Sequence, residues 1–284
     1  TDELLRKGGG RVTALHQERH VLFGGMAPDP SPASCRALIK EVKRQKAHLG
    51  LATDGDADRF GVFDRDGTFL WPNQVLALLL EHLIVTRKWR GVVARSVVTT
   101  SLLDAIAASH GLEVRETPVG FKYIAEVMAK ERMIIGGEES GGLTILGHVP
   151  EKDGVLACAL VAEMAAVRRK SLRDLLKELY RRHGPVVSTR VDLHLDPARM
   201  EGVRGRVATW KQDPPRMVGD WPVEKAVTVD GVKLYLKGGA HLGGQAWVAF
   251  RLSGTEPVAR IYIEARRARD LAPIARAGEK ILTA

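Results

Sequence analysis

The sequence has 284 residues, of which 45% are apolar and 27% charged, a composition typical of a globular protein and not of a disordered, collagen-like or membrane protein. At about 100 to 200 residues per domain, this length favours two or three domains over a single core. The net charge of +9 favours anionic partners, but nucleic acid, an acidic membrane surface and a phosphorylated metabolite would all satisfy it.

The cysteine content and the apolar stretches point to the cytoplasm. Cys35 and Cys158 are the only cysteines, too few for a disulfide framework or a cysteine metal site. The longest apolar stretches, 74–85 and 154–167, are interrupted by charged side chains and are shorter than the roughly 18 residues that a membrane span needs. The chain opens on Thr-Asp-Glu without a signal peptide. We therefore expect a cytoplasmic protein without a membrane segment.

Regular alternation of strands and helices is predicted for the first two thirds of the chain. We expect helices at 2–7, 35–46, 72–86, 101–110 and 121–130, one long helix or a pair at 154–182, and strands at 12–15, 49–53, 61–64, 91–98, 111–116 and 132–136. After residue 185 the pattern changes to shorter strands, at 186–195, 227–229, 232–236, 247–252 and 258–264. The fold class is therefore α/β with parallel or mixed sheets, followed by an α+β region.

An acidic loop joins two of the predicted strands. The run 54–59 reads Asp-Gly-Asp-Ala-Asp-Arg, so in an extended loop Asp54, Asp56 and Asp58 point to one side. Such carboxylates suit Mg²⁺ or Mn²⁺. A calcium loop of the EF-hand type is excluded, because Arg59 and Arg65 stand where that loop needs Gly and Glu. A solvated acidic turn stays open as the alternative.

Two further segments carry polar groups between glycines. The run 136–142 reads Gly-Gly-Glu-Glu-Ser-Gly-Gly; its Glu138 and Ser140 can hydrogen-bond sugar hydroxyls, although a flexible surface loop would look the same. The run 251–257 reads Arg-Leu-Ser-Gly-Thr-Glu-Pro, with Arg260 beyond it. Backbone N–H groups and guanidinium groups of this kind bind phosphate, and a plain hairpin is the alternative.

In this order, the segments resemble the α-D-phosphohexomutase family, which includes the phosphoglucomutases and phosphomannomutases. Four signatures carry the resemblance: the metal loop 54–59, Thr-Pro-Val-Gly-Phe-Lys at 117–122, the sugar loop Gly-Glu-Glu-Ser-Gly at 137–141, and the phosphate loop Arg-Leu-Ser-Gly-Thr at 251–255. The resemblance covers about residues 12 to 265.

The resemblance implies the last three of four family domains. They would be a partial second domain at 1–71 that ends with the metal loop, a sugar-binding α/β domain at 72–185, and an α+β phosphate-binding domain at 186–284. The two α/β domains would have mixed sheets, the first of them incomplete. The family's first domain, whose Ser-His-Asn-Pro-like loop carries the transferred phosphoryl group, has no counterpart here. The resemblance therefore implies a chain that is inactive alone and works with that domain.

The family chemistry implies a role for each signature. A phosphoserine converts a hexose phosphate to a hexose 1,6-bisphosphate intermediate, which turns over and returns its other phosphate. One Mg²⁺ would be held by Asp54, Asp56 and Asp58, and Arg59 would act as a catalytic residue that steadies the same region. Lys152 would bind phosphate or assist proton transfer. The remaining implied substrate contacts are Arg95, Val119, Gly120, Glu138, Ser140, Arg251, Ser253, Gly254, Thr255 and Arg260.

The substrate is expected to be glucose 1-phosphate or glucose 6-phosphate, because the Glu-Glu-Ser version of the sugar loop resembles the glucose-specific branch. Phosphomannomutase and phosphoglucosamine mutase are the alternatives, since bacterial enzymes of both kinds share the phosphate loop. Val119 stands where relatives often have Thr, so only its backbone could contact substrate. A non-catalytic phosphosugar-binding module is an alternative of another class. Nucleic-acid binding is not expected, because the basic residues lack interleaved aromatics.

Overall fold

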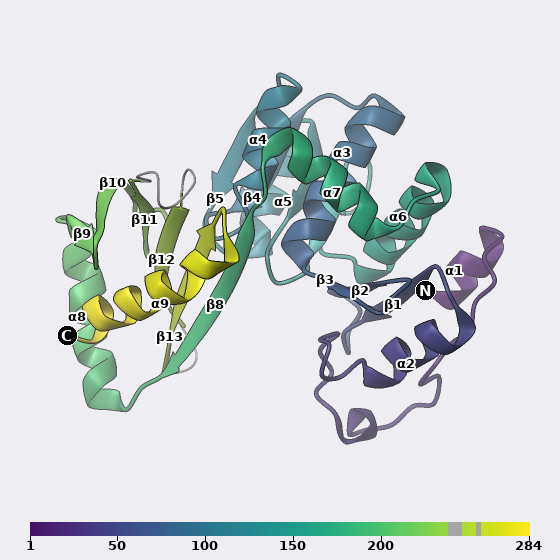
Figure 1. Cartoon of the computed structure of the whole chain (residues 1–284), viewed down its shortest axis with the longest axis horizontal. Coiled ribbons are helices and arrows are strands. Elements are labelled where there is room, and N and C mark those ends of the chain that lie inside the picture. Colours follow the sequence, from purple (N-terminus) through teal and green to yellow (C-terminus); the bar gives the residue numbers. More distant parts are fainter. Residues whose placement is uncertain (238–245, 254–256) are drawn as a thin grey trace. The chain divides into compact units, whose positions relative to one another are not determined.

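The computed structural model describes residues 1–237, 246–253 and 257–284 (Figure 1). The chain forms two compact units, Thr1–Arg182 and His183–Ala284, called here the N-terminal and C-terminal units. No helix of the described residues is both long and apolar enough to cross a membrane.

The N-terminal unit begins with a small antiparallel sheet and its helices. They are α1 (Asp2–Lys7), the 3₁₀ turn η1 (Phe23–Gly25), α2 (Arg36–Gln45), β1 (Leu49–Thr53), β2 (Phe60–Asp64) and β3 (Phe69–Leu70), with the sheet order β1-β2-β3. Helix α2 lies so close to β1 that a Cβ on Gly50 would be 2.7 Å from Val42. The predicted strand at 12–15 is wrong: this segment has no strand partner among the described residues, and a strand requires one.

A mixed four-stranded sheet forms the rest of this unit. Its order is β5-β4-β6-β7, where β4 is parallel to β5 and β6, and β7 is antiparallel to β6. The elements are α3 (Pro72–Arg87), β4 (Val92–Ser96), α4 (Leu102–Ser109), β5 (Val114–Thr117), α5 (Phe121–Lys130), β6 (Met133–Gly137) and β7 (Leu143–Ile145). Helix α3 is buried from Val75 to Ile84 because it packs between β6 and the helices α4 and α6. The short strand β7 directly follows the glycine-rich run 136–142 and was not predicted from the sequence.

The long helical stretch is a pair, α6 (Gly154–Arg168) and α7 (Leu172–His183). The break occurs at Arg169, which adopts the left-handed conformation at φ 51°. The Asp64 carboxylate, only 1% exposed at the end of β2, accepts hydrogen bonds from the N–H groups of Leu172 and Arg173 at 3.2 and 3.0 Å. These bonds satisfy first-turn donors that a helix cannot satisfy by itself, and they attach α7 to the small sheet.

The C-terminal unit is an antiparallel six-stranded sheet with the order β8-β13-β12-β11-β10-β9. Its elements are β8 (Val187–His194), α8 (Pro197–Trp210), β9 (Met217–Val218), β10 (Trp221–Val227), β11 (Val232–Leu236), β12 (Ala246–Leu252), β13 (Val258–Ala265) and α9 (Ala268–Thr283). Helices α8 and α9 cover one core, and Figure 1 shows α9 lying along the sheet. Neither helix was predicted from the sequence, and of the strand predicted at 227–229 only Val227 lies in a strand, as the last residue of β10.

Candidate active site

The three aspartates of the metal loop lie together between β1 and β2. One carboxylate oxygen from each of Asp54, Asp56 and Asp58 lies within 4.8 Å of the others. Asp54 is buried, Asp58 half-buried and Asp56 exposed. Between them, Ala57 takes a left-handed φ of 61°, a conformation that costs a non-glycine residue roughly 1 kcal/mol. The loop therefore converges its carboxylates at the expense of a strained backbone.

Arg59 holds the first of these carboxylates and also lies near the third, since its Nε is 3.6 Å from Asp58 Oδ1. Its backbone N–H donates to Asp54 Oδ1 at 2.9 Å and its Nε to Asp54 Oδ2 at 2.8 Å. Burial alone would raise the pKa of Asp54, but the hydrogen bonds from Arg59 outweigh burial and lower this pKa below its ordinary value. Asp54 is therefore fixed as an anion, which is the form that binds a cation.

Lys152 supplies the positive charge that faces the loop. Its ammonium group forms an ion pair with Asp58 Oδ2. Burial opposes the charge on Lys152, but Asp58, and more weakly Glu151 and Glu138, raise its pKa overall. Asp58 Oδ1 is buried and has no hydrogen-bond partner among the described residues. An acidic cluster with an unsatisfied buried oxygen fits a hard divalent cation such as Mg²⁺.

The start of α6 supports the metal loop through one close contact. The Gly154 N–H donates to the Ala57 carbonyl at 2.9 Å, and a Cβ on Gly154 would lie 2.3 Å from the Arg59 carbonyl oxygen. Asp153 caps the helix by accepting from the Leu156 N–H at 2.8 Å. Only glycine fits where the helix meets the loop.

The sugar loop is a tight turn joined to the metal loop. The Glu138 N–H donates to the Gly142 carbonyl at 2.9 Å, and the Gly141 carbonyl accepts from the Phe60 N–H at 3.3 Å. Because Phe60 follows Arg59 directly, the two loops are held side by side. Ser140 is exposed at the tip of the turn, where its hydroxyl is accessible to a ligand.

Glu138 connects the sugar loop to the 117–122 signature. It is only 6% exposed, and its Oε1 accepts from the Gly120 N–H at 2.7 Å. Gly120 has φ 130° at the start of α5, in the region that favours glycine. The structure therefore brings Gly120 to the sugar loop, with Val119 next to it in the chain and both residues half-buried.

Sequence reasoning missed Glu139. Its Oε2 accepts from the hydroxyls of Ser96 and Thr99 at 3.2 and 3.4 Å, and its N–H donates to Thr99 Oγ1 at 3.2 Å. Both hydroxyl residues are fully buried at the end of β4. This side chain anchors the sugar loop to the sheet, and a carboxylate beside Glu138 in a glycine-rich loop was the available signal.

The predicted substrate contact by Arg95 does not agree with its surroundings. Arg95 is 3% exposed. Its Nε and Nη2 donate to Asp104 at 2.7 and 2.9 Å, and its Nη1 donates to Glu116 at 2.7 Å. With the guanidinium group occupied by two carboxylates from α4 and β5, this geometry favours a structural role for Arg95.

The phosphate loop belongs to the C-terminal unit. Arg251 and Arg260 are directly opposite one another on β12 and β13, so both guanidinium groups arise from the same face of the sheet. Arg251 Nε donates to Asp230 at 2.9 Å, and the Ser253 N–H donates to the Val258 carbonyl at 2.9 Å. Gly254 and Thr255, the other predicted contacts, lie outside the described residues. The described part of the loop thus presents a pair of arginines near a turn.

Three family models match the chain. They are the phosphoglucomutase/phosphomannomutase alpha/beta/alpha domain II at residues 1–67, alpha/beta/alpha domain III at 71–183, and the C-terminal domain at 198–277. They follow one another in the order expected from the sequence signatures.

Curated relatives carry several activity names. A phosphoglucomutase/phosphomannomutase of Thermococcus kodakarensis is 29% identical over 93% of this chain and 53% of its own length. A probable phosphoglucosamine mutase of Methanopyrus kandleri is 32% identical over 95% of this chain and 56% of its own length. Phosphoglucomutase 2 of Saccharomyces cerevisiae is 33% identical over 60% of this chain and 32% of its own length. The chain thus spans about half the length of the two archaeal relatives.

Solved structures agree on the fold. A putative phosphomannomutase from Thermus thermophilus superposes with a TM-score of 0.78 at 31% identity, covering 99% of this chain and 57% of that one. An N-acetylphosphoglucosamine mutase of Aspergillus fumigatus, solved with GlcNAc-6P and magnesium, has a TM-score of 0.51 at 15% identity over 82% of this chain and 52% of its own. The chain belongs to the phosphoglucomutase/phosphomannomutase family, and its relatives are phosphohexomutases.

Proposed function

We propose that this chain provides the metal, sugar and phosphate sites of a phosphohexomutase that interconverts glucose 1-phosphate and glucose 6-phosphate. One observation carries the proposal: within one compact unit, the aspartate cluster is hydrogen-bonded to the sugar loop through Phe60 and Gly141. Lys152 forms an ion pair with Asp58 of this cluster. The negative charge of Glu138 also contributes to raising the pKa of Lys152. Within the N-terminal unit, the residues suited to a divalent cation and to a sugar are therefore adjacent, with the ammonium group of Lys152 interacting with both.

In this proposal Asp54, Asp56 and Asp58 would hold one Mg²⁺, whose positive charge would stabilise the negative charge of a transferring phosphoryl group. Arg59 keeps Asp54 ionised and oriented. Lys152, which forms an ion pair with Asp58, would offer its ammonium group to a phosphate oxygen or a sugar hydroxyl beside the metal loop.

The sugar would be held by Glu138 and Ser140, whose oxygens accept hydrogen bonds from hydroxyl groups. Since Glu138 also accepts from the Gly120 N–H, the backbone at 119–120 is fixed beside the sugar. The distal phosphate would be held by Arg251, Ser253, Gly254, Thr255 and Arg260. Bidentate arginine contacts to phosphate oxygens add orientation as well as affinity.

Two parts of the proposal concern the whole protein. Phosphoryl transfer through a hexose 1,6-bisphosphate requires a phosphoserine, which the family carries in the domain that precedes these three, so we expect turnover only together with that domain. The preferred sugar is proposed to be glucose on the basis of the Glu-Glu-Ser loop. The relatives named phosphoglucosamine mutase and phosphoglucomutase/phosphomannomutase make glucosamine and mannose phosphates the competing substrates.

Calorimetric titration with glucose 6-phosphate, glucosamine 6-phosphate and mannose 6-phosphate, with and without Mg²⁺, tests the proposal. We expect the glucose ester to bind most tightly, and E138A to weaken its binding at least tenfold. The matched control is E126A, which removes an exposed glutamate from α5. Tighter binding of another ester would reassign the substrate, and equal effects of both variants would refute the role of Glu138.

Turnover is tested separately by adding the serine-bearing domain of a relative. Restored conversion of glucose 1-phosphate would support the mutase. Tight sugar-phosphate binding without any restored turnover would instead favour the phosphosugar-binding module.

A further inference from the structure

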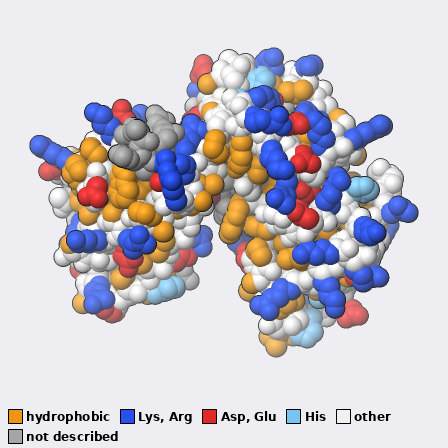
Figure 2. Space-filling view, in the orientation of Figure 1, with side chains coloured by type: hydrophobic (Ala, Val, Ile, Leu, Met, Phe, Trp, Pro, Cys, Tyr) orange, Lys and Arg blue, Asp and Glu red, His pale blue; other side chains and the backbone are white. Residues whose placement is uncertain are grey.

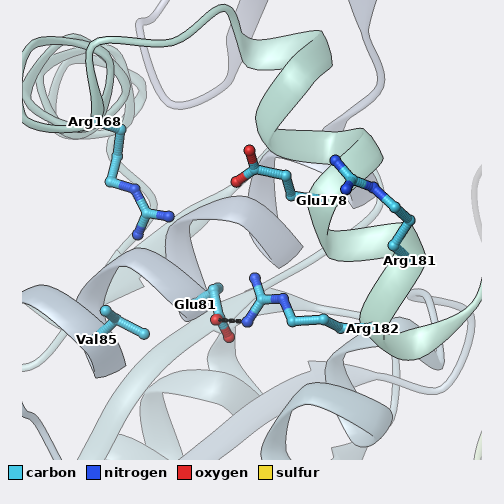
Figure 3. Close-up of a pocket in the computed structure, with 6 residues that line it drawn as sticks. All are labelled: Glu81, Val85, Arg168, Glu178, Arg181 and Arg182. Atoms are coloured by element: carbon cyan, nitrogen blue, oxygen red, sulfur yellow. Dashed lines mark hydrogen bonds and ion pairs between the residues drawn. The ribbon is translucent and has the colours of Figure 1, made fainter.

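A charged pocket lies in the N-terminal unit, between the helices α3, α6 and α7. It has a volume of about 340 Å³, within the range of small-molecule sites. Figure 3 shows its lining, which consists of Glu81, Val85, Arg168, Glu178, Arg181 and Arg182. None of these residues belongs to the metal, sugar or phosphate loop.

The lining of this pocket, called the arginine pocket below, has one apolar side chain, Val85. Its apolar floor comes from a smaller hollow, which shares Glu81, Arg168, Glu178 and Arg182 with it and adds Leu78, His82, Met164, Leu175 and Leu179. The walls are charged: in Figure 3, Arg168 from α6 and Arg182 from α7 extend toward the space between the helices. Figure 2 shows basic and acidic side chains together over the region labelled α3 and α7 in Figure 1. A pocket with an apolar floor and basic walls suits a small organic anion.

The two carboxylates of the pocket are already neutralised. Glu81 is 5% exposed; its Oε2 is 3.0 Å from His110 Nε2, and its Oε1 pairs with Arg182. Glu178 Oε1 accepts from Lys170 Nζ at 2.5 Å. Glu163, on the neighbouring turn of α6, is paired with Arg87 at 2.5 Å. Each of these acidic groups has a cationic partner other than Arg168 and Arg181.

Two arginines of the pocket are left with no ion pair. In the described part of the chain, neither Arg168 nor Arg181 forms a salt bridge or a side-chain hydrogen bond, although the charges of both act on Glu178. Basic side chains in the last turn of a helix are favoured by its dipole, but that attraction does not require them to converge on one pocket. Arg168 is half-buried and Arg181 exposed, and the repulsion between two guanidinium groups that line one pocket would be relieved further by a bound anion than by Glu178 alone, which is shared with Lys170.

We propose that the arginine pocket binds a small phosphate-bearing anion, at a site separate from the active site. Arg168 and Arg181 would contact the phosphate oxygens through the planar donor pairs that make arginine suited to phosphate. Arg182 would stay on Glu81 and fix the rim of the pocket. Free phosphate and a phosphate monoester share this chemistry, and the apolar floor favours the ester.

Nuclear magnetic resonance of the intact chain tests this proposal locally. Inorganic phosphate and, separately, glucose 6-phosphate are titrated at constant ionic strength, and backbone amide shifts are followed at 168–170 and 178–182. We expect saturable shifts there with both probes, at lower concentration for the ester. Equal affinity of the two probes would assign the site to free phosphate.

Two charge-matched variants complete the test. R168Q/R181Q should weaken the local shifts at least tenfold, whereas R90Q/K177Q, which removes two exposed cations of the same unit outside the pocket, should leave them unchanged. Absence of saturable shifts at these amides, or equal weakening in both variants, would overturn the proposal. Because the readout is confined to the ends of α6 and α7, its failure leaves the metal and sugar sites unaffected, and their failure leaves this test unaffected.

Discussion

The contact between α6 and the metal loop gives the sharpest prediction, for G154A. A Cβ at this position would lie 2.3 Å from the Arg59 carbonyl oxygen, 2.8 Å from the Arg59 carbonyl carbon and 2.9 Å from the Ala57 carbonyl oxygen. All three atoms belong to the backbone, so no side-chain rotation relieves the clash. Either the helix start or the metal loop has to move.

The expected cost is about 2 to 4 kcal/mol of stability in the N-terminal unit. Overpacking against a rigid neighbour typically costs about 1 to 3 kcal/mol. Separation also weakens the Gly154–Ala57 hydrogen bond, worth about 0.5 to 1.5 kcal/mol. The displaced loop should in addition bind Mn²⁺ or Mg²⁺ more weakly, because its three carboxylates no longer converge.

Urea unfolding followed by circular dichroism measures the loss of stability, and hydrogen exchange measures local opening at residues 54–60. The matched control is G202A, in the interior of α8, where a new Cβ would meet nothing within 4 Å and where alanine is favoured over glycine by up to about 1 kcal/mol. We expect G202A to be neutral or stabilising. If G154A is as stable as the unmodified chain and exchange at 54–60 is unchanged, the proposed contact is not a structural constraint.

Three further substitutions test other parts of the structure. D56N changes the exposed member of the aspartate cluster and should weaken Mn²⁺ binding at least tenfold in calorimetry while leaving the melting temperature unchanged. The exposed control D213N should change neither the binding nor the melting temperature. Retained Mn²⁺ binding in D56N would argue against a metal site. R95M should lower the urea-unfolding free energy by about 2 to 3 kcal/mol, because Asp104 and Glu116 lose their buried partner, and a fully stable R95M would point instead to the substrate role expected from the sequence. Burial raises the pKa of Glu81, but Arg182 and His110 outweigh it and lower this pKa overall. The ion pairs of ionised Glu81 therefore stabilise the folded chain above the ordinary glutamate pKa of about 4.3, and this stabilisation is lost as the pH falls through the pKa of Glu81 in the folded chain. The melting temperature should fall more steeply with decreasing pH in the unmodified chain than in E81Q. Parallel plots of melting temperature against pH would show that the ionisation of Glu81 does not contribute to stability.

Local signals in the sequence were sufficient where a residue's own chemistry decides its role. Helix α5 begins and ends where the periodicity predicts, at Phe121 and Lys130, because its apolar positions follow the helical repeat. The aspartate triad was recognisable from its residue types and spacing, although its carboxylates converge through a turn with a left-handed Ala57 and not along an extended loop. The family could be recognised without coordinates because its four signatures are short runs of fixed residue types that follow one another in a fixed order.

Tertiary contacts decided the remaining features. Arg95 lies in β4 and is as basic as any phosphate ligand, and only the positions of Asp104 and Glu116 show that it is enclosed. The segment 12–15 has strand-like composition, but a strand forms only with a hydrogen-bonding neighbour. Helix α8 carries its apolar residues against a sheet that is assembled from distant strands, so its pattern is hard to recognise alone.

The sequence by itself determined which chemical groups this protein carries and in what order, since residue type fixes charge, hydrogen-bonding capacity and preferred ligands. Only the tertiary structure decided which groups meet. It pairs Lys152 with Asp58, joins the metal and sugar loops through Phe60 and Gly141, and leaves Arg168 and Arg181 facing one pocket. These contacts link residues that are distant in the chain, and their distances depend on packing that no local pattern records.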